Sequence, residues 1–252
     1  MIRKRRSDLP IARVWDAAAE GWVDFVRTGK DYWRDGVNNP AAFGLIGSIK
    51  GKTVLDLACG EGYNTRILAH KGAKATGIDH SEKMISLARA EERREPLGIR
   101  YYRMDASRLN NISDSSFDLV TCFMALHDIE NYEGAVAEVA RVLKHDGLFV
   151  FSIMHPCFED MMINGVRTNA AERYFDKVQH SVNWNMKRLT KPFKTVSFHR
   201  SLTDYSRVLA KTGLLISRLV EPRPTKEAMR KHPNLIDVLT RPQSIVFEVL
   251  KL

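Results

Sequence analysis

The sequence predicts an α/β fold in which helices cover both faces of a mostly parallel sheet. The first observation is the segment 53–69, where an apolar, β-branched run meets the turn Gly60-Glu61-Gly62 and then a helical pattern. A buried strand followed by a glycine turn and a helix begins a nucleotide-binding unit. The second observation is that further apolar runs alternate with helical patterns, and two of them end in an acid, at Asp79 and Asp105.

The composition is that of an ordinary globular protein. The 252 residues, 44% of them hydrophobic, suffice for one sizeable α/β domain with or without a small cap. No apolar run approaches the roughly 20 residues of a membrane helix, and no apolar segment follows the basic start, so we expect no membrane span and no secretory signal. Cys59, Cys122 and Cys157 form no C-x-x-C pair. This predicts free thiols, a cytoplasmic location, and neither zinc nor another metal.

The net charge of +9 raises the question of an acidic partner such as nucleic acid. The excess is dispersed, and its one dense run lies at residues 3–6. A nucleic-acid partner is therefore not favoured.

The residues before the glycine turn predict a helical cap over positions 1–49. Apolar residues recur at helical spacing over 12–26, and a second helix is expected over 40–49. Between them, Tyr32 and Arg34 lie in an aromatic and charged stretch. They either contact a ligand or belong to the packing, whereas the tryptophans at 15, 22 and 33 are expected to pack the helices onto the sheet.

The charges at the glycine turn indicate the ligand. Asp56 precedes the turn, Glu61 lies inside it, and Thr65 stands where a dinucleotide loop has its third glycine. Nearby negative charge disfavours a pyrophosphate and favours a cationic ligand such as S-adenosylmethionine. The segment 54–62 (VLDLACGEG) resembles the first motif of the class I S-adenosylmethionine-dependent methyltransferases, of the methyltransferase type 11 and ubiquinone-biosynthesis-methyltransferase-like kind.

That resemblance implies a Rossmann-like sheet of seven strands in the order 3-2-1-4-5-7-6, with the last strand antiparallel. The methyltransferase domain would span 50–252, and runs 214–220 and 244–250 would form its last two strands. The cofactor would be S-adenosyl-L-methionine, and the product S-adenosyl-L-homocysteine. The implied cofactor-binding residues are Asp56, Ala58, Cys59, Gly60, Gly62, Asn64, Asp79, His80, Met84, Asp105, Ala106, Phe123 and Met124, with Tyr32 and Arg34 from the cap.

Three of these positions have an alternative interpretation. Asp79, about 20 residues past the turn, suits the ribose hydroxyls of an adenosine, which dinucleotides also carry. Met84 lies against the adenine or merely fills the core. Asp105 accepts the adenine amine or only stabilises a turn.

His127 follows the fourth predicted strand, which begins at residue 117, and His155 follows the fifth, at 148–153. These two histidines are the candidate catalytic residues. The carboxyl ends of parallel strands share one edge, and histidine acts as a base near neutral pH. Asp128 either orients His127 or starts the next turn. A base is needed only if the acceptor keeps its proton, so neither histidine has to act.

The pattern changes over 156–200, where aromatic and basic residues interleave. We expect a β-rich insertion after the fifth strand, in the form of a two-stranded flap whose aromatic side chains close over the pocket. In the resembled family such an insertion sets the choice of substrate. Stacking of nucleobases is the alternative use of these side chains.

The sequence therefore predicts a methyltransferase that moves a methyl group to an oxygen or nitrogen atom of a small-molecule acceptor by in-line displacement. The alternatives are an RNA or protein methyltransferase and a non-catalytic S-adenosylmethionine-binding protein. A dehydrogenase that uses NAD is the least favoured, because Glu61 and Thr65 do not suit a dinucleotide loop. The chain is expected to be a monomer or a homodimer.

Overall fold

A computed structural model describes residues 11–185, 189 and 191–252. The basic run at 3–6, and Lys187 and Arg188 of the insertion, lie outside the described residues.

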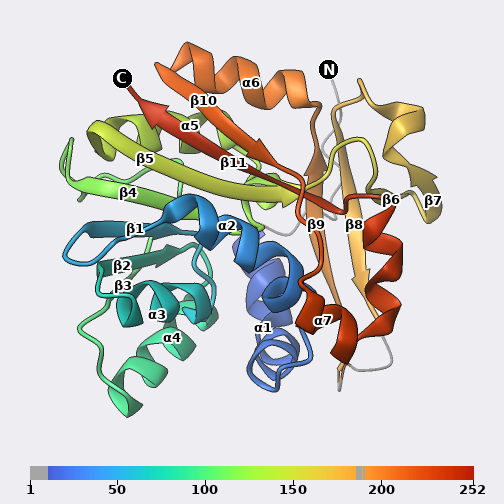
Figure 1. Ribbon diagram of the computed structural model, residues 1–252, viewed down its shortest axis with the longest axis horizontal. Coiled ribbons are helices and arrows are strands. Elements are labelled where there is room, and N and C mark those ends of the chain that lie inside the picture. The colour runs from blue at the N-terminus through green and yellow to red at the C-terminus, as the bar shows by residue number, and fades with distance from the viewer. Residues whose placement is uncertain (1–10, 186–188, 190) are drawn as a thin grey trace.

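The main sheet has seven strands in the order β10-β11-β5-β4-β1-β2-β3, and β11 runs antiparallel to both of its neighbours (Figure 1). The predicted strand order is confirmed, with β10 and β11 as its sixth and seventh members. The strands are β1 (Thr53–Leu57), β2 (Lys74–Asp79), β3 (Arg100–Arg103), β4 (Phe117–Cys122), β5 (Leu143–Met154), β10 (Leu214–Val220) and β11 (Ser244–Lys251). One boundary differs from expectation. The sequence pattern predicts a turn at residues 144–147, but these residues belong to β5, and Asp146 there has a φ of 60°.

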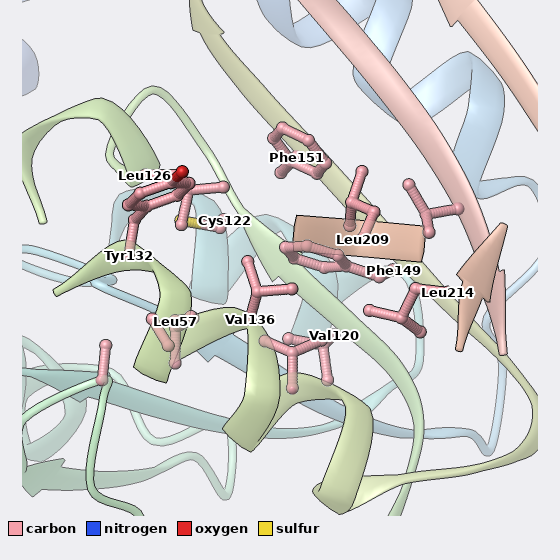
Figure 2. Packing of buried hydrophobic residues seen from close by; sticks show 14 of the residues in the cluster. Leu57, Val120, Cys122, Leu126, Tyr132, Val136, Phe149, Phe151, Leu209 and Leu214 are labelled. Atoms are coloured by element: carbon pink, nitrogen blue, oxygen red, sulfur yellow. The ribbon is translucent and has the colours of Figure 1, made fainter. Parts of the chain in front are cut away.

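Helices cover both faces of this sheet because alternate residues of its buried strands point to opposite sides. On one face, Leu57, Val120, Phe149 and Phe151 pack with α5 and α6 in the main hydrophobic core (Figure 2). On the other face, smaller clusters join the strands to α2, α3 and α4. These helices are α2 (Asn39–Ile46), α3 (Tyr63–His70), α4 (Glu82–Arg94), α5 (Tyr132–Val142) and α6 (Leu202–Lys211). Between α6 and the chain end lie the short helices α7 (Lys226–Lys231) and η4 (Pro233–Leu239).

The insertion forms a second, antiparallel sheet with the order β7-β6-β8-β9. Its strands are β6 (Asp160–Ile163), β7 (Val166–Asn169), β8 (Val178–Trp184) and β9 (Phe193–His199), with the short helix η3 (Ala170–Arg173) after β7. The expected two-stranded flap is therefore wrong in strand number. The additional pair is a hairpin turning at Asn164 and Gly165, both with positive φ. The Asn-Gly dipeptide is a strong hairpin signal that the sequence already carried.

The N-terminal segment joins the two sheets. Helix α1 (Ile11–Arg27) lies between α4 of the main sheet and β9 of the inserted sheet (Figure 1). A π-helix, η1 (Arg34–Asn38), then runs directly into α2. The sequence pattern does not show this π-helix. Among the helices described, none is long and apolar enough to cross a membrane.

Candidate functional site

A cavity of about 580 Å³ lies where the carboxyl ends of β1, β2 and β4 meet α1 and the inserted sheet. Most of the predicted site residues line it: Arg34, Asp56, Ala58, Cys59, Gly60, Asn64, Asp79, His80, Met84, Asp105, Ala106, Phe123, Met124 and His127. Three predicted residues are not among those that line it, namely Tyr32, Gly62 and His155. The cavity thus brings most of the predicted group together, and the roles of its members stay predictions.

The glycine turn owes its shape to left-handed backbone conformations. Ala58, Gly60 and Gly62 have φ values of 54°, 58° and 85°. A side chain at Gly62 would collide with the ring of Tyr101 on β3, so this glycine serves packing at the start of α3. Gly60 has open space around it, and its bare backbone faces the cavity.

Asp56 joins three elements beneath the turn. Its Oδ2 accepts a hydrogen bond from Thr65 Oγ1 of α3 at 2.6 Å, and its Oδ1 accepts one from Thr121 Oγ1 of β4 at 2.8 Å. Burial raises the pKa of Asp56 to about 7. Thr65 is therefore more than a departure from the dinucleotide pattern, because its hydroxyl fixes the carboxyl group at the cavity floor.

Asp79 holds the turn from the side of β2. Its Oδ2 accepts from the backbone N–H of Gly60 at 2.9 Å, and its Oδ1 accepts from that of Ser81 at 2.8 Å. Ser81 in turn caps α4 by accepting from Met84 N at 3.1 Å. A carboxylate has about four acceptor positions, so Asp79 retains capacity for a ligand.

Three further predicted residues, Asp105, Asn64 and Met84, also line the cavity, and the first two are held by hydrogen bonds. Asp105 Oδ1 accepts from both the N–H and the hydroxyl of Ser107, so the predicted turn stabilisation is present at a residue that also lines the cavity. Asn64 accepts from Asn39 Nδ2 at 2.9 Å. Met84 is buried, in contact with both the core and the cavity.

The residues that follow β4, Phe123 and Met124, are held by contacts with β5 and α2. Met124 has a φ of 50°, and its N–H donates to Ser152 Oγ of β5 at 3.0 Å. Asn38 Nδ2 of the π-helix donates to the same hydroxyl at 3.1 Å. Phe123 stacks on Phe43 of α2, with ring centroids 5.4 Å apart. The π-helix thereby supports the wall on which Phe123 and Met124 lie.

Trp22 of α1 reaches into the glycine turn. Its Nε1 donates to Glu61 Oε2 at 3.0 Å, and its ring makes an edge contact with Trp184 of β8. Within the described part of the chain, the other oxygen of Glu61 is buried without a hydrogen-bond partner, and burial raises the pKa of Glu61. The tryptophan does pack, as expected, but its hydrogen bond to the turn has no signal in the sequence.

Arg34 and Tyr32 lie in different surroundings. The Arg34 guanidinium covers the ring of Tyr63 at 3.6 Å and donates to Asp35 at 3.1 Å, at the cavity wall. Tyr32 instead stacks on His232, with centroids 4.1 Å apart, and contacts Asn234. The prediction that Tyr32 lines the site therefore does not agree with its position.

The two candidate histidines are separated. His127, in the short helix η2 (Leu126–Asp128), lines the cavity and is 8% exposed; its Nε2 lies 3.6 Å from Asp128 Oδ1. Burial lowers the pKa of His127 to about 4 and raises that of Asp128 to about 8, so both groups are largely uncharged at neutral pH.

His155 does not line the cavity. Its Nε2 lies 2.9 Å from Glu221 Oε1, and its Nδ1 accepts from Cys157 N. The strand ends lie at one edge as expected, but the ring of His155 is held by Glu221, which follows β10. We therefore drop His155 from the candidate catalytic residues.

The wall of the inserted sheet supplies residues that the sequence pattern did not single out. Glu159, His180, Val182, Thr195 and Ser197 line the cavity. Strand alternation in β8 and β9 was the available signal, but alternation does not tell which face points inward.

The lining is acidic although the whole chain carries +9. Among the described residues that line it, nine carboxyl side chains face one guanidinium, that of Arg34, and no lysine. The carboxyl groups belong to Asp31, Asp56, Glu61, Asp79, Asp105, Asp128, Glu130, Glu159 and Asp160. Such a lining favours a cationic ligand and repels phosphate groups.

Comparison with known proteins shows that this chain is similar to methyltransferases. Residues 55–151, from β1 into β5, match the family model described as a methyltransferase domain. An uncharacterized protein of Haemophilus influenzae is 27% identical over 85% of this chain and 87% of its own length. A demethylmenaquinone methyltransferase of Tropheryma whipplei is 36% identical, but over only 46% of this chain and 48% of its own. A crystal structure of an S-adenosylmethionine-dependent methyltransferase from Mesorhizobium loti superposes with a TM-score of 0.69. It is 29% identical, over 84% of this chain and 96% of that one.

Proposed function

Because the chain belongs to the class I S-adenosylmethionine-dependent methyltransferases, we propose that it transfers a methyl group from this cofactor to an oxygen or nitrogen atom of a small-molecule acceptor. The observation that carries the proposal is the acidic lining of the cavity beside a bare glycine turn. The cofactor has a sulfonium and an ammonium group and no phosphate, which complements this lining.

The residues present fit the cofactor. Asp79 keeps acceptor capacity for the ribose hydroxyls, and Asp105 has the same capacity toward the adenine amine. Gly60 permits close approach of the ligand to the backbone. Arg34, the one guanidinium among the described lining residues, suits the carboxylate of the methionine part.

When bound, the cofactor supplies a methyl group on an already activated leaving group. The task left to the chain is to hold the acceptor in line and to exclude water. The contact of α1 with the inserted sheet, through Trp22 and Trp184, closes one side of the cavity for this purpose.

The small-molecule acceptor is supported by the cavity volume of about 580 Å³, which is in the range of small-ligand sites. It is also supported by similarity to a demethylmenaquinone methyltransferase and to a ubiquinone biosynthesis O-methyltransferase. Their match covers about half of their length, so their own substrates are not transferred to this chain. The acidic lining disfavours entry of a nucleic-acid backbone into the cavity, because the carboxylates would repel its phosphate groups. The competing proposal is that the chain binds S-adenosylmethionine without catalysis. It differs from the first proposal because no methylated product would form.

The test of the cofactor is calorimetric titration with S-adenosylmethionine, S-adenosylhomocysteine and NAD. We expect micromolar binding of the two sulfur ligands and none of NAD. Asp79→Asn should weaken that binding at least about tenfold, or about 1.4 kcal/mol. Asparagine keeps an acceptor for one of the two backbone N–H groups, so the turn survives better than with alanine. Asp146→Asn, at an exposed carboxylate in β5, is the matched control and should change nothing.

The test of the acceptor uses cofactor that carries a trideuterated methyl group, incubated with cell extract. Label in compounds below the ultrafiltration limit supports the proposal. Label in RNA or protein overturns its acceptor class. Cofactor binding without label in any fraction supports the non-catalytic role instead.

A further inference from the structure

The inserted sheet carries a histidine–glutamate–histidine group at the cavity, formed by His180, Glu159 and His199. Glu159 precedes β6, His180 lies in β8 and His199 ends β9. All three side chains are at least nine-tenths buried, with exposed fractions of 7%, 4% and 1% for Glu159, His180 and His199. A role for this group in holding the acceptor rests on the proposed function, because only a methyltransferase has an acceptor to hold.

The side chains of Glu159 and His199 are in hydrogen-bond contact. His199 Nε2 lies 3.1 Å from the carbonyl oxygen of Tyr174, which only accepts, so Nε2 carries a proton. His199 Nδ1 lies 2.7 Å from Glu159 Oε1. Burial alone would lower the pKa of His199, but the hydrogen bond and charge of Glu159 outweigh it and raise that pKa. The contact with His199 fixes the carboxyl group of Glu159, and its other oxygen, Oε2, faces His180.

His180 has unused hydrogen-bonding capacity. It lines the cavity, and within the described residues neither of its ring nitrogens has a hydrogen-bond partner. Its Nε2 lies 3.9 Å from Glu159 Oε2, beyond hydrogen-bond distance but close enough for a small shift to form the bond. Catalytic hydrogen bonds are often long before the substrate binds. With a proton on Nε2 directed at Glu159, Nδ1 becomes the basic nitrogen.

The other groups packed around His180 leave little net charge for an acceptor. Burial lowers the pKa of His180 and of nearby His127, so both rings are neutral at pH 7. Asp128, with its pKa raised to about 8 by burial, is mainly protonated, and Glu159 is paired with His199 at 2.7 Å. The guanidinium of Arg200 donates hydrogen bonds to the carbonyl oxygens of residues 126, 129 and 130. A neutral hydroxyl group suits this environment better than a carboxylate or an amine, because it both donates and accepts one hydrogen bond.

Next to the polar group, the cavity wall is aromatic. Trp184, Trp22 and Phe25 contact one another with centroid distances of 5.4–6.2 Å, and all three line the cavity. This wall suits an apolar ring on the acceptor.

We propose that the acceptor is a neutral aromatic compound with a hydroxyl group, that this hydroxyl binds at His180, and that His180 takes its proton during methyl transfer. The acceptor oxygen forms a bond to the methyl carbon while the sulfur–carbon bond breaks. The electron pair of the broken sulfur–carbon bond stays on sulfur. The hydroxyl proton moves to Nδ1 of His180. Glu159 is a positioning residue that holds the opposite nitrogen and is itself held by His199.

The binding test uses three probes that share a propyl-substituted ring: 4-propylcatechol, 4-propylbenzoate and 4-propylbenzylamine. Each is titrated by calorimetry into the full chain saturated with S-adenosylhomocysteine. The neutral catechol is expected to bind at least about tenfold more tightly than the anion or the cation. Equal or tighter binding of a charged probe, or no binding of any probe at millimolar concentration, would overturn the proposal.

Variants then separate binding from proton transfer. His180→Phe should weaken catechol binding at least about tenfold and leave binding of S-adenosylhomocysteine within about twofold, which also shows that the variant is folded. His180→Asn keeps an amide for the hydroxyl but no base. It should hold the catechol with nearly unchanged affinity while methylation, followed by mass spectrometry, falls at least about 100-fold.

Glu159→Gln keeps shape and loses charge. It should lower kcat for the catechol about tenfold with little change in KM, the split expected of a positioning residue. His145→Phe, at an exposed histidine in β5, is the control. Indifference of catechol binding and methylation to His180 overturns this inference alone. Failure of the native chain to bind S-adenosylhomocysteine would overturn the proposed function itself.

Discussion

At the scale of single residues, the site depends on hydroxyl groups that hold buried carboxyl groups. Thr65 and Thr121 each donate to one oxygen of Asp56, which is 1% exposed. A buried carboxyl group without such donors would lose the stabilisation that offsets its desolvation. The departure from the dinucleotide pattern at Thr65 is thus explained by a local hydrogen bond at the end of β1.

Thr65→Val should therefore destabilise the protein by about 1 kcal/mol, because one oxygen of Asp56 loses its donor without a change in side-chain volume. The pKa of Asp56 should rise further, since the Thr65 hydrogen bond lowers it. Urea unfolding measures the first effect. Thr240→Val, at an exposed threonine, should stay within about 0.5 kcal/mol of the native chain. Equal effects of the two substitutions would show that the Thr65 hydroxyl does not stabilise Asp56.

At the scale of elements, the contact between α1 and the inserted sheet determines how the cavity is closed. Gly21 lies where α1 meets β9, and a Cβ there would lie 2.8 Å from Phe193 Cδ1 and 3.0 Å from the carbonyl oxygen of Lys191. Helix propensity alone favours alanine over a glycine inside a helix by about 1 kcal/mol. The close approach outweighs that preference.

Gly21→Ala is accordingly expected to destabilise the protein by about 1–3 kcal/mol through overpacking. The matched control is Gly44→Ala in α2, where a Cβ meets no other atom within 4 Å, so helix propensity should stabilise by about 0.5–1 kcal/mol. Thermal unfolding of both variants provides the comparison. A stabilising Gly21→Ala would mean that α1 does not pack closely on β9.

At the scale of the whole molecule, an acidic cavity lies within a basic chain, and this arrangement makes stability depend on pH. Burial raises the folded-state pKa of Asp56 to about 7 and of Asp128 to about 8, from an ordinary value of 3.8. Each group binds its proton more tightly when folded. Its contribution to stability is therefore complete below pH 3.8 and is lost as the pH rises through the folded pKa.

Asp128→Asn removes one of these titrations. The difference in unfolding free energy between Asp128→Asn and the native chain should move in favour of the variant by about 2 kcal/mol between about pH 6.5 and 8.5. Taking the difference cancels the other titrating groups, among them His127, whose pKa of about 4 lies below this window. Urea unfolding at several pH values measures it. A difference that does not change with pH would show that the pKa of Asp128 is not raised in the folded chain.

Local patterns were sufficient for the framework of the fold. The apolar run before Gly60, the acids at the ends of β1 and β2, and the alternation of strands and helices predicted an α/β sheet with a ligand site at the glycine turn. The resemblance to the class I methyltransferases supplied the strand order and the set of cofactor-binding residues. The hairpin at Asn164 was predictable in principle from its Asn-Gly pair. The π-helix was not, because its stability comes from packing against other segments rather than from its own residues.

The glycine turn and the acidic side chains at the strand ends follow from the amino-acid order alone, because each depends on residues close together in the chain. The strand order was implied by the resemblance to the class I methyltransferases and not by any local pattern. Three other features needed the packed molecule: His155 turns toward Glu221, Tyr32 stacks on His232, and His180 lines the cavity beside Glu159. Strand alternation offers two faces, and the choice between them depends on which segment packs against the sheet. For His155 that segment lies 66 residues further along the chain, so no local pattern encodes it.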